Sequence, residues 1–170
     1  ECVMGDSPVQ GSELCSVVEA MYSYEQLLSI SGDPLWGDYL ERLAFNALPA
    51  TISADMWTHQ YDQQTNQVRC ARLPEDHVIF GTNGPESHLF GLEPNFGCCT
   101  ANFNQGWPKF ALSAFMRAED GIVSTALIPA SVTTEIGGHR VTCRLETEYP
   151  FRDRLTYTVT TDAPVDFALK

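Results

Sequence analysis

The hydrophobic periodicity of the chain changes near residue 120, and this change limits the folds that the sequence can adopt. Upstream, apolar residues recur at helical spacing over residues 14–28 and again over residues 36–47. Downstream, apolar and polar residues alternate, and Gly137-Gly138 separates two such runs in the manner of a two-residue hairpin. Helices followed by strands predict an α+β chain of two domains, residues 1–120 and residues 121–170.

Three helices are predicted in the first part. The first covers residues 12–31 and stops at Gly32, because glycine tolerates the left-handed conformation that ends a helix. The second follows Asp33-Pro34, an N-cap with a first-turn proline, and ends before Pro49. The third begins near Gly106-Trp107-Pro108.

The charge balance is strongly acidic. Ten Lys and Arg against 22 Asp and Glu give a net charge of −12, which repels phosphate backbones and anionic lipid surfaces. Nucleic acid and membranes are therefore not expected as partners. No apolar run is long enough to span a bilayer, so a soluble protein is expected, either cytoplasmic or secreted. The chain starts without Met and stops within a predicted strand, so we expect an excerpt of a longer protein.

Two adjacent cysteines, Cys98 and Cys99, are predicted to lie just before the third helix in a glycine-flanked stretch. Neighbouring cysteines seldom bridge each other, because the ring that they close is strained. Two thiolates side by side suit a soft or borderline metal, and zinc is the first candidate. Glu13 and Cys15 place a carboxylate and a third thiol at the start of the first helix, so these four residues could close a four-ligand site.

Less specific interpretations of these residues are also open. Residues two apart on a helix point to nearly opposite sides, so Glu13 and Cys15 can share a metal only if the helix starts late. Otherwise Glu13 complements the helix dipole and Cys15 is a packing residue. Independently of this, Cys98 and Cys99 could be two buried core thiols, since free cysteine is often buried. The remaining cysteines in the body of the chain, Cys70 and Cys143, are predicted to be buried as small hydrophobic residues.

Three motifs resemble those of the glycoside hydrolase family 127 β-L-arabinofuranosidases. They are Glu13-Leu14-Cys15, Gly97-Cys98-Cys99, and Asn102 three residues after the second cysteine. The resemblance implies the C-terminal part of an (α/α)6 barrel followed by the start of an antiparallel β-sandwich. Family members carry two prolines where this chain has Thr100-Ala101, which makes a different subgroup or substrate plausible.

The resemblance also implies a zinc-dependent mechanism. The zinc ligands would be Glu13, Cys15, Cys98 and Cys99. Cys98 would double as nucleophile, and an upstream glutamate, for which Glu1 is the nearest match and Asp6 the fallback, would act as acid/base. Attack by a cysteine on the anomeric carbon and hydrolysis of the thioglycosyl enzyme would retain configuration.

The expected partner is a carbohydrate, an L-arabinofuranoside or a related sugar, and a homodimer is left open. Trp57, His59 and Tyr61 are the candidate substrate contacts, although aromatic residues near a helical hairpin are commonly core residues. The rival to the enzyme is a closed structural zinc clamp, in a non-catalytic carbohydrate-binding or scaffold protein, in which no substrate reaches the sulfur.

Overall fold

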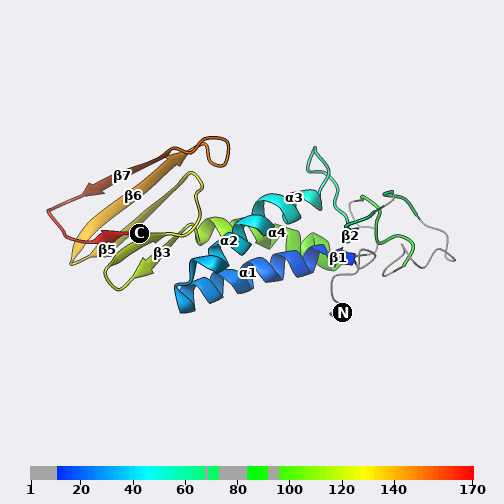
Figure 1. Cartoon of the computed structure of the whole chain (residues 1–170), viewed down its shortest axis with the longest axis horizontal. Helices are drawn as coiled ribbons and strands as arrows, with labels where there is room; N and C mark the ends of the chain where they lie inside the picture. Colours follow the sequence, from blue (N-terminus) through cyan, green and yellow to red (C-terminus); the bar gives the residue numbers. More distant parts are fainter. Residues whose placement is uncertain (1–10, 68, 73–83, 92–95) are drawn as a thin grey trace.

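The computed structural model describes residues 11–67, 69–72, 84–91 and 96–170. A layer of helices lies between two three-stranded β-sheets at one end and a small two-stranded ribbon at the other (Figure 1). The described chain is thus a mixed structure with helices first and most strands afterwards, as the change of period predicts.

Helix α1 (Leu14–Ser31) buries one face, formed by apolar residues three and four apart. The buried apolar residues are Leu14, Val17, Val18, Met21 and Leu28. The helix ends as predicted at Gly32, whose φ of 67° is left-handed and whose N–H donates to the Leu28 carbonyl at 2.8 Å.

Strand β1 (Gly11–Glu13) precedes α1 and pairs antiparallel with β2 (Asp62–Gln64). The first helix therefore begins two residues later than residue 12, because Ser12 and Glu13 belong to a strand. A side chain at Gly11 would overlap the Asp62 carboxylate, so glycine allows the two strands to lie this close.

The second helical run is longer than predicted. It comprises α2 (Pro34–Arg42), a π-helical turn η1 (Leu43–Ala47) and α3 (Leu48–Ala50), so it continues through Pro49 instead of ending before it. Its start is as predicted, because the Asp33 carboxylate accepts the Leu35 N–H at 3.0 Å and Pro34 occupies the first turn.

The π turn explains how the helix tolerates a proline. Leu48 N–H already donates to the Leu43 carbonyl, five residues back. The next amide in that pattern belongs to Pro49, which has no N–H to donate to Ala44. The indole Nε1 of Trp107 donates to the Ala44 carbonyl instead, at 2.9 Å. A side chain of another helix thus satisfies the backbone acceptor that the proline leaves open.

Helix α4 (Gly97–Leu112) starts well upstream of Gly106-Trp107-Pro108, so the predicted start of the third helix is wrong. Pro108 lies inside the helix, where it removes a single backbone donor. Packing outweighs that loss, because Cys99, Gly106 and Phe110 form one buried face against the other helices. Cys98 and Cys99 consequently lie in the first turn of a helix and not in a loop before it.

The strands form two three-stranded sheets. One holds β3 (Phe115–Ala118), β4 (Gly121–Ser124) and β8 (Ala168–Leu169), in which β4 and β8 are parallel. The other is an antiparallel meander of β5 (Ala130–Ile136), β6 (His139–Thr147) and β7 (Leu155–Thr161). Gly137 and Gly138, with φ of 59° and 80°, form the predicted two-residue turn between β5 and β6.

The two sheets share an apolar cluster. Ile122 of β4 packs in one group with Val141 and Cys143 of β6, and both of these residues are fully buried. Cys143 is therefore the buried small residue that the alternation predicts. The strands of these two sheets begin at Phe115, and the division of the chain at residue 120 stays a prediction. In the described part of the chain, no helix has the length and apolar content needed to cross a bilayer.

Candidate metal centre

Glu13 and Cys15 come together because α1 starts late. Glu13 is the last residue of β1 and has an extended backbone, with φ of −77° and ψ of 138°, whereas Cys15 lies in the first helical turn. The Leu14 N–H donates to the Tyr61 carbonyl at 2.9 Å, which fixes the point where strand becomes helix. The condition under which these two side chains can share an ion is thus met.

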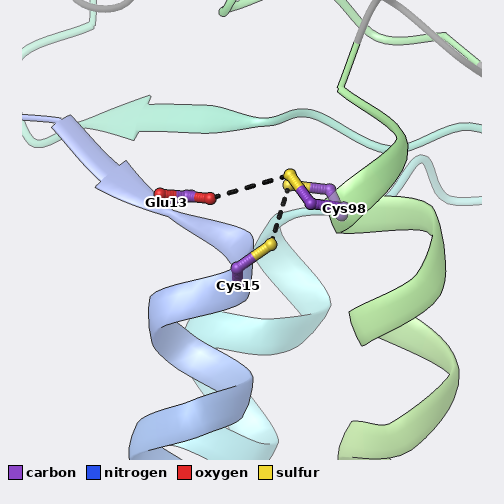
Figure 2. A group of neighbouring side chains, drawn as sticks. Glu13, Cys15 and Cys98 are labelled. Atoms are coloured by element: carbon purple, nitrogen blue, oxygen red, sulfur yellow. Dashed lines mark hydrogen bonds between the residues drawn. The ribbon is translucent and has the colours of Figure 1, made fainter. Parts of the chain in front are cut away.

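Cys98 and Cys99 approach the same point from the first turn of α4. The sulfur atoms of Cys15 and Cys99 are 3.5 Å apart, and the Cys98 sulfur lies 3.9 Å from Glu13 Oε1. One ligand atom from each of the four residues lies within 4.8 Å of all the others. Figure 2 shows Glu13, Cys15 and Cys98 pointing toward one another from the end of β1 and the starts of the two helices.

The cluster has the size and chemistry of a metal site. Tetrahedral coordination with zinc–sulfur bonds of about 2.3 Å places two sulfur ligands about 3.8 Å apart. The Cys15–Cys99 separation of 3.5 Å is close to that value. Three thiols and a carboxylate also form a donor set that suits zinc and other borderline or soft ions. The four residues could therefore hold a metal ion.

Burial makes the thiols of Cys15 and Cys99 hard to ionise in the absence of a cation. Burial raises the pKa of Cys15 to about 12, although hydrogen bonds from Asn102 and Cys99 act in the opposite direction. Burial, together with the neighbouring Cys15, raises the pKa of Cys99 as well. Cys99 is fully buried, Cys15 is half-buried and Cys98 is exposed, so one of the three cysteine residues is accessible to solvent.

Asn102 and Gln105 support the cluster from within α4. Gln105 Nε2 donates to Asn102 Oδ1 at 3.0 Å, which leaves the Asn102 amide N–H groups to face the Cys15 sulfur. Partners of this kind orient metal ligands. Sequence reasoning missed Gln105, because its three-residue spacing from Asn102 has meaning only if α4 begins at Gly97.

The predicted substrate contacts have different environments. Trp57 is exposed, with 75% of its surface accessible. Tyr61 is buried and its ring stacks on Phe96 with centroids 4.0 Å apart. His59 is buried, and its Nε2 is hydrogen-bonded to Thr100 Oγ1 at 2.9 Å. The structure thus brings His59 and Tyr61 against the segment that carries Cys98 and Cys99.

Other predicted residues lie elsewhere. Cys70 is exposed, so its predicted burial is wrong; it follows a short stretch of polar residues, and its sulfur accepts the amide N–H groups of Gln60 and Gln67, each at 3.2 Å. Glu1 and Asp6, the predicted acid/base and its fallback, lie outside the described residues.

The fold is similar to solved glycoside hydrolases. A GH127 β-L-arabinofuranosidase from Geobacillus stearothermophilus T6 matches 95% of this chain with a TM-score of 0.72 and 17% identity. A GH127 β-arabinofuranosidase matches 87% with a TM-score of 0.66 and 18% identity, and a glycoside hydrolase matches 92% with 0.65 and 19%. The matches cover 25%, 21% and 25% of those chains, so this chain spans about a quarter of their length.

Sequence comparison gives a more specific result. No curated protein matches the chain. The model of the family described as "Beta-L-arabinofuranosidase, GH127 catalytic domain" matches residues 6–112, which is more than half of the chain and includes all four residues of the cluster. The chain therefore belongs to the GH127 β-L-arabinofuranosidase family.

Proposed function

We propose that this chain supplies the metal ligands and the nucleophile of a retaining β-L-arabinofuranosidase. The observation that carries the proposal is the convergence of Glu13, Cys15, Cys98 and Cys99, with Cys98 alone of the three thiols exposed. Family membership supports the same chemistry. Because the chain spans about a quarter of the solved relatives, the activity is proposed for the whole protein that carries it.

Zinc is the ion that fits the cluster best, with the four residues as its ligands. A bound zinc ion would keep the thiols ionised at neutral pH, where burial alone keeps Cys15 and Cys99 protonated. Three thiolates and one carboxylate around a divalent ion carry a formal charge of about −2, so the sulfur atoms remain electron-rich.

Cys98 is assigned as nucleophile because a substrate can reach its sulfur. Cys99 is fully buried and packs into the helical core, so a sugar ring cannot approach it. Cys15 is half-buried and its sulfur faces Cys99. The two inner thiols would therefore serve as ligands, and the exposed thiol would react.

The reaction proceeds in two displacements. The Cys98 sulfur attacks the anomeric carbon and forms a C–S bond, while the bond to the leaving oxygen breaks and a carboxylic acid gives that oxygen a proton. The resulting carboxylate then takes a proton from water, whose oxygen attacks the anomeric carbon and releases the Cys98 thiolate. Two inversions give net retention. Glu1 is the predicted acid/base, with an expected separation of about 5–5.5 Å from the nucleophile.

The surrounding architecture is proposed on the same basis. The helices would form the C-terminal part of an (α/α)6 barrel, and the two sheets with their shared apolar cluster would begin a β-sandwich. The substrate would be an L-arabinofuranoside or a related sugar. Of the predicted contacts Trp57, His59 and Tyr61, Trp57 has the ring exposure that stacking on a sugar requires.

The decisive test compares two exposed cysteines in the protein that carries this chain. Cys98→Ser should lower turnover of an aryl β-L-arabinofuranoside by at least about 10³-fold, because a serine hydroxyl is a far weaker nucleophile. Cys70→Ser is the matched control and should retain the parent rate. Mass spectrometry of the protein after incubation with a slow substrate should find the sugar attached to Cys98. Parent-level turnover by Cys98→Ser would exclude the mechanism.

The second candidate is a structural zinc clamp, favoured by the burial of Cys15 and Cys99 between two helices. Metal analysis with thiol labelling separates the two functions. An enzyme should let an iodoacetamide-type arabinose reagent label Cys98, with free arabinose blocking the reaction. A clamp should show no labelling and should unfold when a chelator removes the metal.

A further inference from the structure

The four residues of the cluster belong to two arms of the chain. One arm is β1 with the start of α1, which carries Glu13 and Cys15. The other arm is the first turn of α4, which carries Cys98 and Cys99. Figure 2 shows the two arms facing each other across the cluster. Since they are 85 residues apart in sequence, contacts within the fold set the distance between them, and the apolar core that α1 and α4 share is one of these contacts.

A single short segment, residues 59–62, touches both arms. On one side, the Tyr61 carbonyl accepts the Leu14 N–H at 2.9 Å, and Asp62 is the strand partner of Glu13. On the other side, His59 bonds Thr100, and the Tyr61 ring stacks on the residue that precedes Gly97. We call residues 59–62 the bridging segment.

The bridging segment is itself held in place by its neighbours. His59 exchanges two backbone hydrogen bonds with Gly91, both 3.1 Å long, and Gln60 N–H donates to Thr51 at 2.7 Å. Gln60 Nε2 also donates to the His88 carbonyl at 2.8 Å. A segment fixed at this many points moves little, so a contact from it can fix the position of another element.

His59 is the side chain that connects the bridging segment to α4. The residue is 7% exposed, and the bond from Nε2 to Thr100 Oγ1 is the only hydrogen bond that its ring makes within the described part of the chain. Thr100 follows Cys99 directly, in the first turn of α4. The position of this turn decides where both sulfur atoms of that arm lie.

We propose that His59 is a positioning residue that, through Thr100, sets the distance between the two ligand-bearing arms before any ion binds. The inference rests on the metal site of the proposed function but not on sugar hydrolysis. Groups behind metal ligands typically change metal affinity about 10- to 100-fold when they are removed. Removal of the His59–Thr100 hydrogen bond should therefore weaken metal binding by about 10- to 100-fold.

The test uses the protein that carries this chain. It measures hydrogen exchange of the metal-free protein and cobalt binding by the same protein, using the sulfur-to-cobalt charge-transfer band. His59→Leu and Thr100→Val should each speed amide exchange in residues 97–101 and weaken cobalt binding about 10-fold or more. His59→Gln and Thr100→Ser keep polar groups at both positions and should restore most of the affinity. Thr51→Val is the matched control, because it removes another buried threonine hydroxyl, bonded to the Leu48 carbonyl.

The double variant His59→Leu/Thr100→Val should bind cobalt no more weakly than either single variant, because both remove one interaction. Additive losses would overturn the proposal, as would exchange and affinity that match the Thr51→Val control. Amide hydrogen exchange is measured on the metal-free protein, so it tests the positioning role even if the parent protein binds no cobalt. Absence of cobalt binding by the parent would instead count against the proposed function.

Discussion

The two ends of the molecule contain buried cysteines of the same exposure and different surroundings. Cys143, at the sheet end, is fully buried among apolar residues of two sheets. Cys99, at the opposite end of the helical layer, is equally buried, but its sulfur lies 3.5 Å from that of Cys15. Burial raises the pKa of both thiols. Burial alone therefore does not separate a core thiol from a metal ligand; the atoms around the sulfur do.

The largest expected effect comes from removing each of these thiols. Four ligands share about 10–16 kcal/mol of zinc binding in structural sites, so Cys99→Ala should cost about 3 kcal/mol of binding, roughly 100-fold in Kd. Cys143→Ala should leave zinc affinity unchanged. Competition titrations with a chelator measure both. Equal losses in the two variants would mean that Cys99 acts through packing and not as a ligand.

Truncation of a large hydrophobic residue at the sheet end should lower the stability of the fold and leave zinc affinity unchanged. Leu145 of β6 is 1% exposed, and Leu145→Ala should lower the free energy of unfolding by about 2–5 kcal/mol through lost burial and a cavity. Chemical denaturation measures this loss. Zinc affinity of the folded variant should equal that of the parent, and a weakened site would show that the two ends are energetically coupled.

A smaller effect concerns Glu25, a buried carboxyl group between the two ends. Burial raises its pKa, although the Ser113 hydroxyl, 2.9 Å from Oε2, and Lys109 oppose the shift. Because the folded-state pKa is above the unfolded value, the unfolded chain ionises first. The free energy of unfolding should therefore fall as pH rises from the ordinary value of 4.5 through the raised one.

Glu25→Gln tests this dependence. The amide stays neutral, so the variant should lose this part of the pH dependence and be more stable than the parent at pH 8, by about 1 kcal/mol. Urea denaturation of both proteins between pH 4 and 8 measures the difference. A constant difference across this range would show that folding does not raise the pKa of Glu25.

The smallest effect is expected in the β5–β6 turn. Gly138 has a φ of 80°, which an L-residue with a side chain adopts at a cost, and Gly138→Ala should lower stability by about 1 kcal/mol. Thermal unfolding measures this change. Gly37→Ala lies in helix α2, where alanine is favoured, and should not destabilise the protein. Similar losses of stability in the two variants would indicate that the added methyl group disturbs packing, and that the backbone conformation of Gly138 is not the cause of the loss.

The meander of β5, β6 and β7 could be largely predicted from the sequence because its strands follow one another along the chain. Alternation along β6 and the Gly137-Gly138 turn specify the strands, their register and the burial of Cys143. The C-terminal end of α1 at Gly32 and the cap at Asp33 also follow from nearby residues.

The site end could be predicted only in part, because distant segments build it. Its four candidate metal ligands are predictable from their chemistry and from family motifs, and the structure brings them together. The three-residue strands β1 and β2 are too short to show a period, and pairing between them delays the start of α1. The start of α4 was misplaced because Pro108 is a typical first-turn residue, whereas packing of Phe110 and its neighbours extends the helix upstream. Nothing in the sequence near His59 reveals its bond to Thr100.

The π turn in the second helical run has a consequence for substitutions at two distant positions. With an ordinary amide at position 49, the N–H of that residue could donate to the Ala44 carbonyl and would compete with the indole of Trp107 for this acceptor. With Phe at position 107, that carbonyl would lose its donor while Pro49 still withholds one. The proline and the tryptophan should therefore tolerate replacement together better than separately, as a matched pair that links two helices.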